Sequence, residues 1–387
     1  MRTPLHITLS ESSAAKSPAG SMEYRGATTA ARFAGPQVEL AAMLSNCGVY
    51  DLGFRAQISL TGKDRVRWLN GMVTNKIRDL VPGHGVYAFV LTPQGHILGD
   101  LHAYNQGESI LIETDRSQLE NILAIFKRYI IMDQVMVTSL ADTVTGIGVA
   151  GPNSRAILRT AGIEIDELLP LHLGVPQCSC QCDRLECTVI RSEDRSQSHS
   201  QNHSEDSGYE CYEIWLAPQS VKQAWDALVG AGAVPTGAEA LESERILSGI
   251  PLYGIDIRER DLPQETEQLR AMNFNKGCYI GQEIVERIRS RGNVHRKLAR
   301  FAGSGHGQIS PGAKIAVAEK EVGEITSVTS RPDGGDEFVA LGYIRREHSA
   351  ENQEVTISGV RARVVPLRTA ESAPATPETG LVQPQLP

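Results

Sequence analysis

The chain has 387 residues, of which 41% are hydrophobic and 22% are charged, a composition typical of globular proteins with two or three domains. Its formal net charge of -8 argues against a protein that coats nucleic acid or an anionic membrane through bulk charge. No run approaches the roughly 18 apolar residues needed to cross a bilayer, and the N-terminus lacks the apolar core of a secretory signal, so we expect a cytoplasmic protein. Seven cysteines, an odd count in a large chain, favour reduced thiols over a disulfide framework.

Three segments are polar and lack any periodic apolar pattern. Residues 1–36 and 369–387 predict a disordered lead-in and a disordered tail. Residues 191–206 predict a polar surface insertion between strands.

Strand and helix patterns alternate between these segments. The predicted elements are strand 56–62, helix 63–72, hairpin 86–104, strand 109–115, helix 116–130, strand 212–218 and helix 220–232. The hairpin turns at Pro93, Gln94 and Gly95. Because a strand leading into an amphipathic helix occurs twice, about a hundred residues apart, we expect two related α+β subdomains. From Lys297 onward, short β-like runs separated by Gly, Pro and Asp predict a small antiparallel barrel or sandwich.

The stretch KGCYIGQE at residues 276–283 places a cysteine ahead of an amphipathic helix that runs to about Ser290. The N-terminal amide groups of that helix and nearby Lys276 favour the thiolate form of Cys278. Gly277 and Gly281 allow a tight turn and the close approach of another group. The alternative interpretation is that Cys278 fills a small pocket between helix and sheet, the commoner role of a lone cysteine.

Residues 276–300 carry seven basic side chains against two acidic ones. This local excess suits a polyanion such as a polyglutamate tail, a phosphate or RNA, with a possible RNA contact at residues 287–300. A solvated helix face followed by a linker explains the same charges equally well.

KGCYIGQE resembles the signature of the YgfZ-type folate-binding proteins, which are relatives of the glycine-cleavage T-protein (aminomethyltransferase). Further matches run in family order through residues 47–75, 87–104 and 244–265 and into the terminal barrel, so the resemblance covers about residues 37–368. It implies a three-domain α+β cloverleaf with two related ferredoxin-like subdomains, a C-terminal antiparallel β-barrel and tetrahydrofolate, or a one-carbon derivative, in the central opening. The domains expected from the resemblance and the chain pattern are 37–150 with 240–295 for folate binding, 151–239 for the second α+β unit and 296–368 for the barrel.

The resemblance also implies site residues. Asp100 corresponds to the carboxylate that T-proteins place against the folate, and Tyr87 to an aromatic side chain that lines the folate site. Arg245 and Tyr253 match positions facing the same opening, where an arginine pairs with a folate carboxylate, although a structural ion pair is its commoner use. The folate-binding set expected from the resemblance is completed by three residues of the octapeptide: Lys276, Gly277 and Gln282.

One departure from the T-protein pattern concerns a glutamate. T-proteins carry Gly-Glu-x-Gly-aromatic-Glu, and the equivalent GYECYEI here has Tyr209 in place of the first glutamate, whereas Glu213 keeps its place. T-proteins also lack the octapeptide, so the sequence favours the YgfZ-type interpretation.

Two functions compete. The first is a tetrahydrofolate-binding protein that supports assembly or repair of iron-sulfur proteins, with Cys278 contacting a cluster or a partner, such as an assembly factor or a client enzyme. One thiolate cannot hold a cluster alone, so a partner would complete the site. The alternative is a folate-dependent aminomethyltransferase or other one-carbon transferase, in which Asp100 positions the reacting amine and turnover continues when Cys278 is replaced by alanine. Across these two functions, the candidate catalytic residues are Cys278 and Asp100.

A third interpretation is a metal site in CSCQCDRLEC, residues 178–187. In an extended strand Cys178, Cys180 and Cys182 project to one side, and Cys187 or His203 adds a fourth ligand. Because C-x-C-x-C is tighter than ordinary zinc spacing, no metal ligands are assigned.

Overall fold

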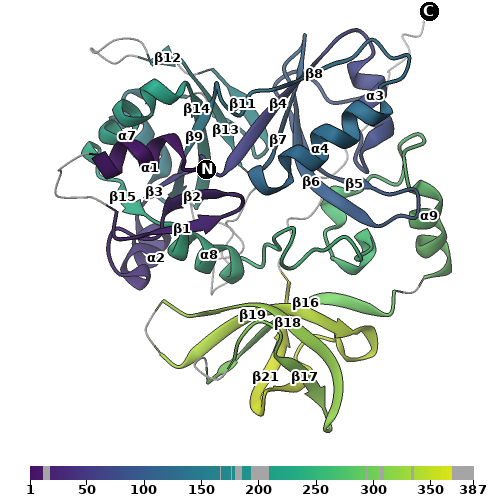
Figure 1. Ribbon diagram of the computed structural model, residues 1–387. Coiled ribbons are helices and arrows are strands. Elements are labelled where there is room, and N and C mark those ends of the chain that lie inside the picture. Colours follow the sequence, from purple (N-terminus) through teal and green to yellow (C-terminus); the bar gives the residue numbers. More distant parts are fainter. Residues whose placement is uncertain are drawn as a thin grey trace, which may run out of the picture.

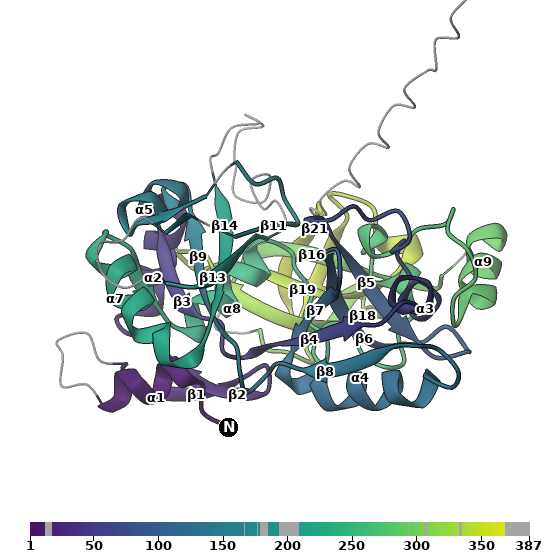
Figure 2. The same ribbon diagram turned by 90° about the horizontal axis from the view of Figure 1, so that it is seen from above.

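The computed structural model describes residues 1–11, 18–165, 167–175, 177–178, 185–192, 209–292, 294–305, 309–332 and 335–367. Two mixed subdomains lie side by side, and a barrel lies against them on one side (Figure 1). Figure 2, seen from above, shows the barrel strands behind the two sheets. The expected α+β cloverleaf with a C-terminal antiparallel barrel is therefore confirmed.

The first subdomain is a five-stranded sheet covered by two helices. Its strand order is β5-β6-β7-β4-β8, and every pairing is antiparallel. Apolar side chains of both helices, including Trp68, Leu69, Ile122 and Phe126, pack on the sheet in one core. The elements are β4 (Arg55–Thr61), α3 (Arg65–Met72), β5 (Gly85–Leu91), β6 (Ile97–Asn105), β7 (Ile110–Asp115), α4 (Arg116–Tyr129) and β8 (Met136–Ser139).

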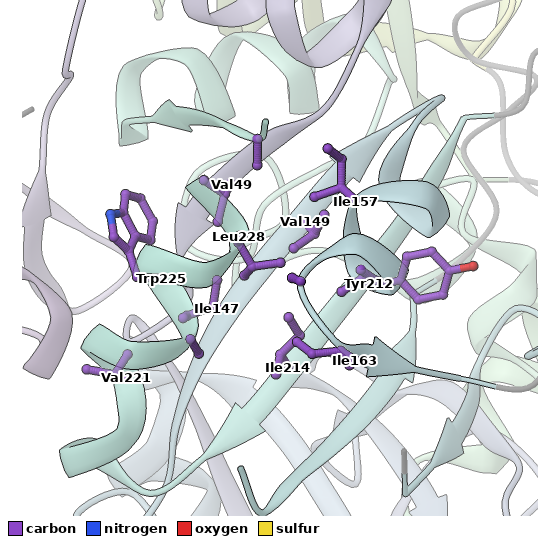
Figure 3. Close-up of a cluster of buried hydrophobic side chains, with 14 of the residues drawn as sticks. Val49, Ile147, Val149, Ile157, Ile163, Tyr212, Ile214, Val221, Trp225 and Leu228 are labelled. Carbon is purple, nitrogen blue, oxygen red and sulfur yellow. The ribbon is translucent and has the colours of Figure 1, made fainter. Parts of the chain in front are cut away.

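The second subdomain is a six-stranded sheet in the order β11-β13-β14-β9-β3-β15. Figure 3 shows its core, where Trp225 and Leu228 of α7 lie beside Val149 and Ile147 of the sheet. The elements are β3 (Gly48–Asp51), β9 (Thr145–Gly151), α5 (Ser154–Thr160), β11 (His172–Gly174), β13 (Cys187–Arg191), β14 (Glu210–Leu216), η1 (Pro218–Ser220), α7 (Val221–Gly230) and β15 (Val234–Thr236). A separate two-stranded ladder joins β10 (Ile163–Glu164) to β12 (Gln177–Cys178).

The domain boundaries differ in one respect from those expected. Strand β3 and all but the last residue of β9 fall within residues 37–150, which the sequence assigns to the first subdomain, yet β3 pairs with β9, and β9 pairs with β14, in the second sheet. The physical reason is the long β9–β14 ladder, which runs from Thr145 opposite Leu216 to Gly151 opposite Glu210. Most of the predicted insertion 191–206 and the whole tail 369–387 lie outside the described residues.

The predicted disorder of residues 1–36 is wrong for the described part of that segment. It forms α1 (Pro4–Glu11), a hairpin of β1 (Ser21–Tyr24) and β2 (Ala27–Ala30), and the start of α2 (Pro36–Ser45). Leu5 and Leu9 are buried in the second core. Asp51, on β3, accepts hydrogen bonds from the Thr3 and Thr29 hydroxyls, so a distant carboxylate holds this polar segment in place.

The barrel is closed, because its last strand pairs with its first. Its strands are β16 (Arg296–Ser304), β17 (Lys314–Val317), β18 (Lys320–Ser330), β19 (Glu337–Arg345), β20 (Glu354–Ile357) and β21 (Val360–Val365), with η5 (Arg346–His348) after β19. The connection into it contains α8 (Ala238–Leu247), η2 (Pro263–Glu265), η3 (Leu269–Ala271) and α9 (Gln282–Arg291). Within the described residues, no helix is long and apolar enough to span a membrane.

Candidate functional site

A polar cavity of about 120 Å³ lies where both sheets, α8 and the N-terminal hairpin meet. We call it the Asp100 cavity. Three of the predicted site residues line it: Tyr87, Asp100 and Arg245. The other lining side chains that the argument uses are Arg25, Arg55, His102, Asp115, Glu213 and Arg270.

Asp100 is held on both carboxylate oxygens. The Tyr87 hydroxyl donates to Oδ2 at 2.6 Å, and the Gln118 amide of α4 donates to Oδ1 at 2.7 Å. The backbone N–H of Asp100 in turn donates to Gln118 Oε1 at 2.9 Å. Burial, followed by the charge of Asp100, raises the pKa of Tyr87 well above its ordinary value, so the phenol remains a donor. The carboxylate therefore has a fixed orientation.

Glycine precedes Asp100 for a reason of packing. A Cβ at Gly99 would lie 2.9 Å from Gln118 Oε1, so a larger residue would push away the side chain that orients the carboxylate. The LGD sequence at residues 98–100 thus couples the strand to α4.

Arg270, in η3, is a cavity residue that the sequence did not single out. Its guanidinium lies over the Tyr87 ring, with Cζ 4.6 Å from the ring centroid. Nε and Nη2 both donate to Gln268 Oε1, at 3.1 and 2.9 Å. The arginine is thus pre-positioned as a planar cation beside the Asp100 carboxylate.

An acidic cluster of Glu113, Asp115 and Glu213 lies near Asp100, and Asp115 and Glu213 line the same cavity. Arg55 donates from Nε to Glu113 at 2.7 Å and from Nη1 to Asp115 at 3.1 Å. Burial raises the pKa of Glu113 well above its ordinary value, and the nearby charge of Glu213 adds to the effect. Burial and then the charge of Arg55 lower the pKa of His102 to about 3, so this imidazole is neutral near pH 7.

Glu213 is the ionised partner in this cluster. Burial opposes its charge, but Arg55 and hydrogen bonds from Glu113 and Ser192 outweigh burial and lower the pKa of Glu213. Ser192 donates to Oε1 at 2.8 Å and Trp215 to Oε2 at 3.1 Å. Tyr209, which replaces the T-protein glutamate, is instead a buried core residue and is absent from the cavity lining.

Arg245 lines the cavity but is committed to the scaffold. Its five N–H groups all have acceptors: Glu242 receives Nε and one Nη2 proton, Ser327 Oγ the other at 3.0 Å, and Asp256 and the Ile250 carbonyl receive Nη1 at 2.6 and 2.9 Å. The side chain is only 2% exposed. This is a structural network joining α8 to the barrel, so the expected pairing with a folate carboxylate would require donors that are already engaged.

The remaining predicted folate-binding residues do not line the cavity. Tyr253 packs against a neighbouring core that contains Tyr87 and Phe89. Gln282 begins α9 and accepts a hydrogen bond from the Tyr279 N–H at 3.3 Å. Gly277 is exposed, and a Cβ added there would meet nothing within 4 Å, so the expected close approach is wrong at this position. It holds at Gly281, whose φ is +84° and whose added Cβ would lie 2.6 Å from the Thr92 carbonyl oxygen.

Lys276 anchors the cysteine segment to α3. Its buried ammonium donates to the carbonyls of Asn70 and Asn75 at 2.7 Å and also to that of Val73, at the C-terminal end of α3. Burial lowers the pKa of Lys276 to about 7, whereas three carbonyl acceptors and the negative helix end favour the charged form, since only an ammonium has three protons to donate. The amine is thus directed toward α3 rather than free to activate the thiol.

Cys278 lies in the segment 273–281, which we call the Cys278 loop. The residue is exposed and is not among the residues that line the Asp100 cavity, so the thiol is not part of that site. Exposure also excludes the alternative in which the cysteine fills a packed pocket. The predicted helix after it is confirmed as α9.

Much of the basic charge that follows is paired. Arg289 lies 3.3 Å from Glu286, Arg296 contacts Asp261 and Glu265 at 2.5 and 3.1 Å, and Lys297 lies 2.7 Å from Glu267. These pairs favour the interpretation of the segment as a solvated structural face. Most of the cysteine cluster at residues 178–187 lies outside the described residues; within the described part of the chain, no group of three or more potential metal ligands is found.

Comparisons with known proteins agree with this architecture. The family model of the GCVT N-terminal domain matches residues 12–177. An aminomethyltransferase of Rubrobacter xylanophilus is 27% identical over 362 residues, which cover 93% of this chain and 92% of the relative. A putative chloroplastic transferase of Arabidopsis thaliana is 27% identical over 326 residues, covering 82% and 70%. These matches support a relationship between this chain and the glycine-cleavage T-protein superfamily.

The fold comparison extends over nearly the whole chain. The crystal structure of the glycine cleavage system aminomethyltransferase T of Bartonella henselae superposes with a TM-score of 0.82, at 21% identity, and covers 95% of this chain and 97% of that one. At this identity the likeness shows the fold alone.

Proposed function

We propose that this chain binds tetrahydrofolate or a one-carbon derivative in the Asp100 cavity and acts as a folate-dependent one-carbon transferase of the T-protein type. The observation that carries the proposal is the fixed Asp100 carboxylate, held by Tyr87 and Gln118 in a cavity that also contains Arg270 and Glu213. The T-protein alternative is therefore preferred over the iron-sulfur role that the octapeptide favoured.

The donor set of the cavity suits a reduced folate. Glu213 and Asp100 are carboxylates able to accept from the N–H groups of a pterin edge, and Tyr87 and Arg270 supply a flat aromatic and guanidinium surface. Sites for drug-sized ligands usually measure roughly 300–1,000 Å³. The cavity, at about 120 Å³, lies below this range, so it would hold only part of a folate and the rest of the ligand would extend through its opening.

The folate would supply a carrier for the one-carbon unit, and the residues of the chain would supply orientation. Asp100 is placed to hold an amine in one direction, because two hydrogen bonds fix its carboxylate before a ligand binds. His102 stays neutral near pH 7 and so adds no positive charge that would repel an ammonium substrate. Arg55 neutralises part of the negative charge of the acidic cluster through its ion pairs with Glu113 and Asp115.

Titration of tetrahydrofolate onto the wild type and Asp100→Ala tests this function. We expect the variant to lose roughly tenfold or more in affinity, the scale of one hydrogen bond to a charged group. In Asp100→Asn, which keeps the shape and removes the charge, turnover with an aminomethyl donor should fall by a larger factor than tetrahydrofolate affinity does. Cys278→Ala is the matched control with unchanged affinity. Equal affinity of the wild type and Asp100→Ala would refute the assignment of the cavity.

A second candidate function rests on one observation, the exposure of Cys278 on an anchored loop outside the cavity. In this interpretation the thiol contacts an iron-sulfur assembly factor or client enzyme, whose own ligands complete a cluster site. Replacing the native protein in cells by Cys278→Ala and measuring iron-sulfur enzyme activities would separate the two. If those cells kept full iron-sulfur enzyme activities and the variant kept its transferase turnover, only the transferase function would remain supported.

A further inference from the structure

The two sheets are joined at a short seam that places two histidines opposite each other. His84, just before β5, and His172, the first residue of β11, form an isolated antiparallel bridge. The flanking hydrogen bonds run from the Gly85 N–H to the Leu171 carbonyl at 2.7 Å and from the Leu173 N–H to the Gly83 carbonyl at 2.9 Å. The histidines therefore form the non-hydrogen-bonded kind of cross-strand pair, in which the side chains come closest.

Each imidazole is held by its own strand in the same manner. His84 Nδ1 lies 3.2 Å from the carbonyl oxygen of Pro82, and His172 Nδ1 lies 2.9 Å from that of Pro170. A carbonyl only accepts, so in the neutral ring the proton sits on Nδ1 and the lone pair on Nε2. The two strands thus carry the same Pro-x-His arrangement, one from each subdomain.

The Nε2 atoms are available on both rings. Neither has a hydrogen-bond or ion-pair partner among the residues that the structure describes, and both side chains are partly exposed. The ring centroids are 3.9 Å apart with 60° between the planes. Two imidazoles that bind one tetrahedral ion through Nε2 at about 2.0–2.1 Å hold their ring centroids about 5 Å apart, so binding would require these two rings to separate by about 1 Å.

We propose that His84 and His172 bind one divalent cation of the zinc, nickel and copper class through their Nε2 atoms. Imidazole nitrogen favours these ions over magnesium or calcium, which prefer oxygen. A donor bond from the other ring nitrogen to a backbone carbonyl is the arrangement that orients metal-ligating histidines. Because no third His, Cys, Asp or Glu joins the pair within the described residues, water completes the coordination and binding is weaker than at a four-ligand structural site.

The ion would connect the two subdomains beside the Asp100 cavity. The only described backbone pairing at this seam consists of the bridge and its two flanking hydrogen bonds. A Cβ at Gly85 would lie 2.2 Å from the ring of Tyr104, a residue of the cavity lining, so the seam packs directly on the cavity wall. Metal binding would restrain the relative movement of the walls without contributing a ligand to the cavity itself.

The test is titration of Co²⁺ and Zn²⁺ onto tag-free, chelator-treated protein, with His84→Ala and His172→Ala as variants. His96→Ala is the matched control, because His96 Nδ1 also lies 3.1 Å from a carbonyl oxygen, that of Arg260, but no second imidazole within the described residues contacts it. We expect one ion per chain in the wild type and the control, and at least a tenfold loss of affinity in each single variant, since one imidazole cannot chelate. The melting temperature should rise with zinc in the wild type and the control only.

Cobalt distinguishes this site from the cysteine cluster. Nitrogen and water ligands give weak visible bands, whereas thiolate ligands add intense near-ultraviolet charge-transfer bands. Near-ultraviolet bands that persist in both histidine variants, unchanged affinity in those variants, or no binding at millimolar metal would each overturn the proposal. Equal melting temperatures of the metal-free variants and the wild type would show that the substitutions leave the fold intact.

Discussion

The Asp100 cavity and the Cys278 loop are built in opposite ways. The cavity is buried, and segments from Tyr24 to Arg270 in the sequence supply its lining. The loop is exposed at Cys278 and continuous in sequence, and one buried lysine anchors it to α3. The Asp100 cavity contains several charged side chains that interact with one another, whereas the Cys278 loop presents one sulfur at the surface.

This difference shows that the most recognisable motif of the chain and the polar groups able to bind a ligand lie in different regions. The octapeptide is the most recognisable stretch of the chain, yet Lys276 and Gly281 in it act through backbone contacts that set the path of the loop. The polar groups able to hold a ligand lie elsewhere, on residues that no single motif connects. Substitutions that affect one region and leave the other unchanged will show whether the two act independently.

The largest expected effect comes from the network that joins the cavity to the barrel. Arg245→Met should lower the free energy of unfolding by about 3–5 kcal/mol, because it leaves Asp256 buried without its cation. Urea denaturation monitored by circular dichroism measures this loss. The exposed Arg260→Met is the matched control and should change stability by less than about 0.5 kcal/mol.

If Arg245 instead serves the folate, its replacement would weaken tetrahydrofolate binding and leave stability near that of the control. That result would restore the ligand-binding role that the resemblance implied for this arginine.

A smaller effect is expected at the anchor of the Cys278 loop. Lys276→Met removes the donor to three carbonyls and should cost about 1–3 kcal/mol of unfolding free energy, the scale of buried groups left unsatisfied. Hydrogen exchange at the amides of residues 277–281 should accelerate, whereas tetrahydrofolate affinity stays within twofold of the wild type. A large loss of affinity without a stability change would instead show that the amine reaches the ligand.

The elements that the sequence predicted well are those with strong local patterns. The 86–104 hairpin with its turn at Gly95, the amphipathic helices α4 and α7 and the barrel strands all follow from spacing along a few turns or strands. The lead-in was missed because its strands are only four residues long and rich in Ser and Thr. Arg25 and Gly26, both at positive φ, form the tight turn that could have revealed the hairpin.

The cavity was predictable only in part. Asp100 and Tyr87 share one hairpin and were found through the resemblance, but Arg270 and Gln118 reach Tyr87 and Asp100 through tertiary contacts that leave no periodic signal. Lys276 was misjudged for the same reason, since its acceptors lie about two hundred residues earlier in the chain. Long-range polar contacts of this kind depend on the assembled fold.

The acidic cluster of the cavity should make stability depend on pH. Burial raises the pKa of Glu113, so above about pH 4.3 the folded chain binds more protons than the unfolded one, and the unfolding free energy falls as pH rises. Glu113→Gln removes this dependence, so its unfolding free energy should exceed that of the wild type increasingly as pH rises from 4 to 8. The two proteins should have similar stability near pH 4.

Glu213→Gln is the control with the opposite sign. The pKa of Glu213 is lowered, so its charge contributes stability that is present above its unfolded pKa and is lost as pH falls, and removing it should destabilise the protein at pH 8. Denaturation curves at pH 4, 6 and 8 measure both slopes. If the unfolding free energies of the wild type and Glu113→Gln changed equally with pH, the assignment of a retained proton to Glu113 would be disproved.

The smallest effect is expected at the thiol itself. Cys278→Ser should change the unfolding free energy by less than about 0.5 kcal/mol, because the side chain is exposed. It should remove one rapidly reacting thiol per chain in a colorimetric disulfide-exchange assay, whereas Cys47→Ser should remove none, since Cys47 is fully buried and burial raises its pKa to about 11. Saturating tetrahydrofolate should leave the rate at Cys278 unchanged if the loop and the cavity are independent. Protection of the thiol by the ligand would contradict that independence and unite the two regions in one site.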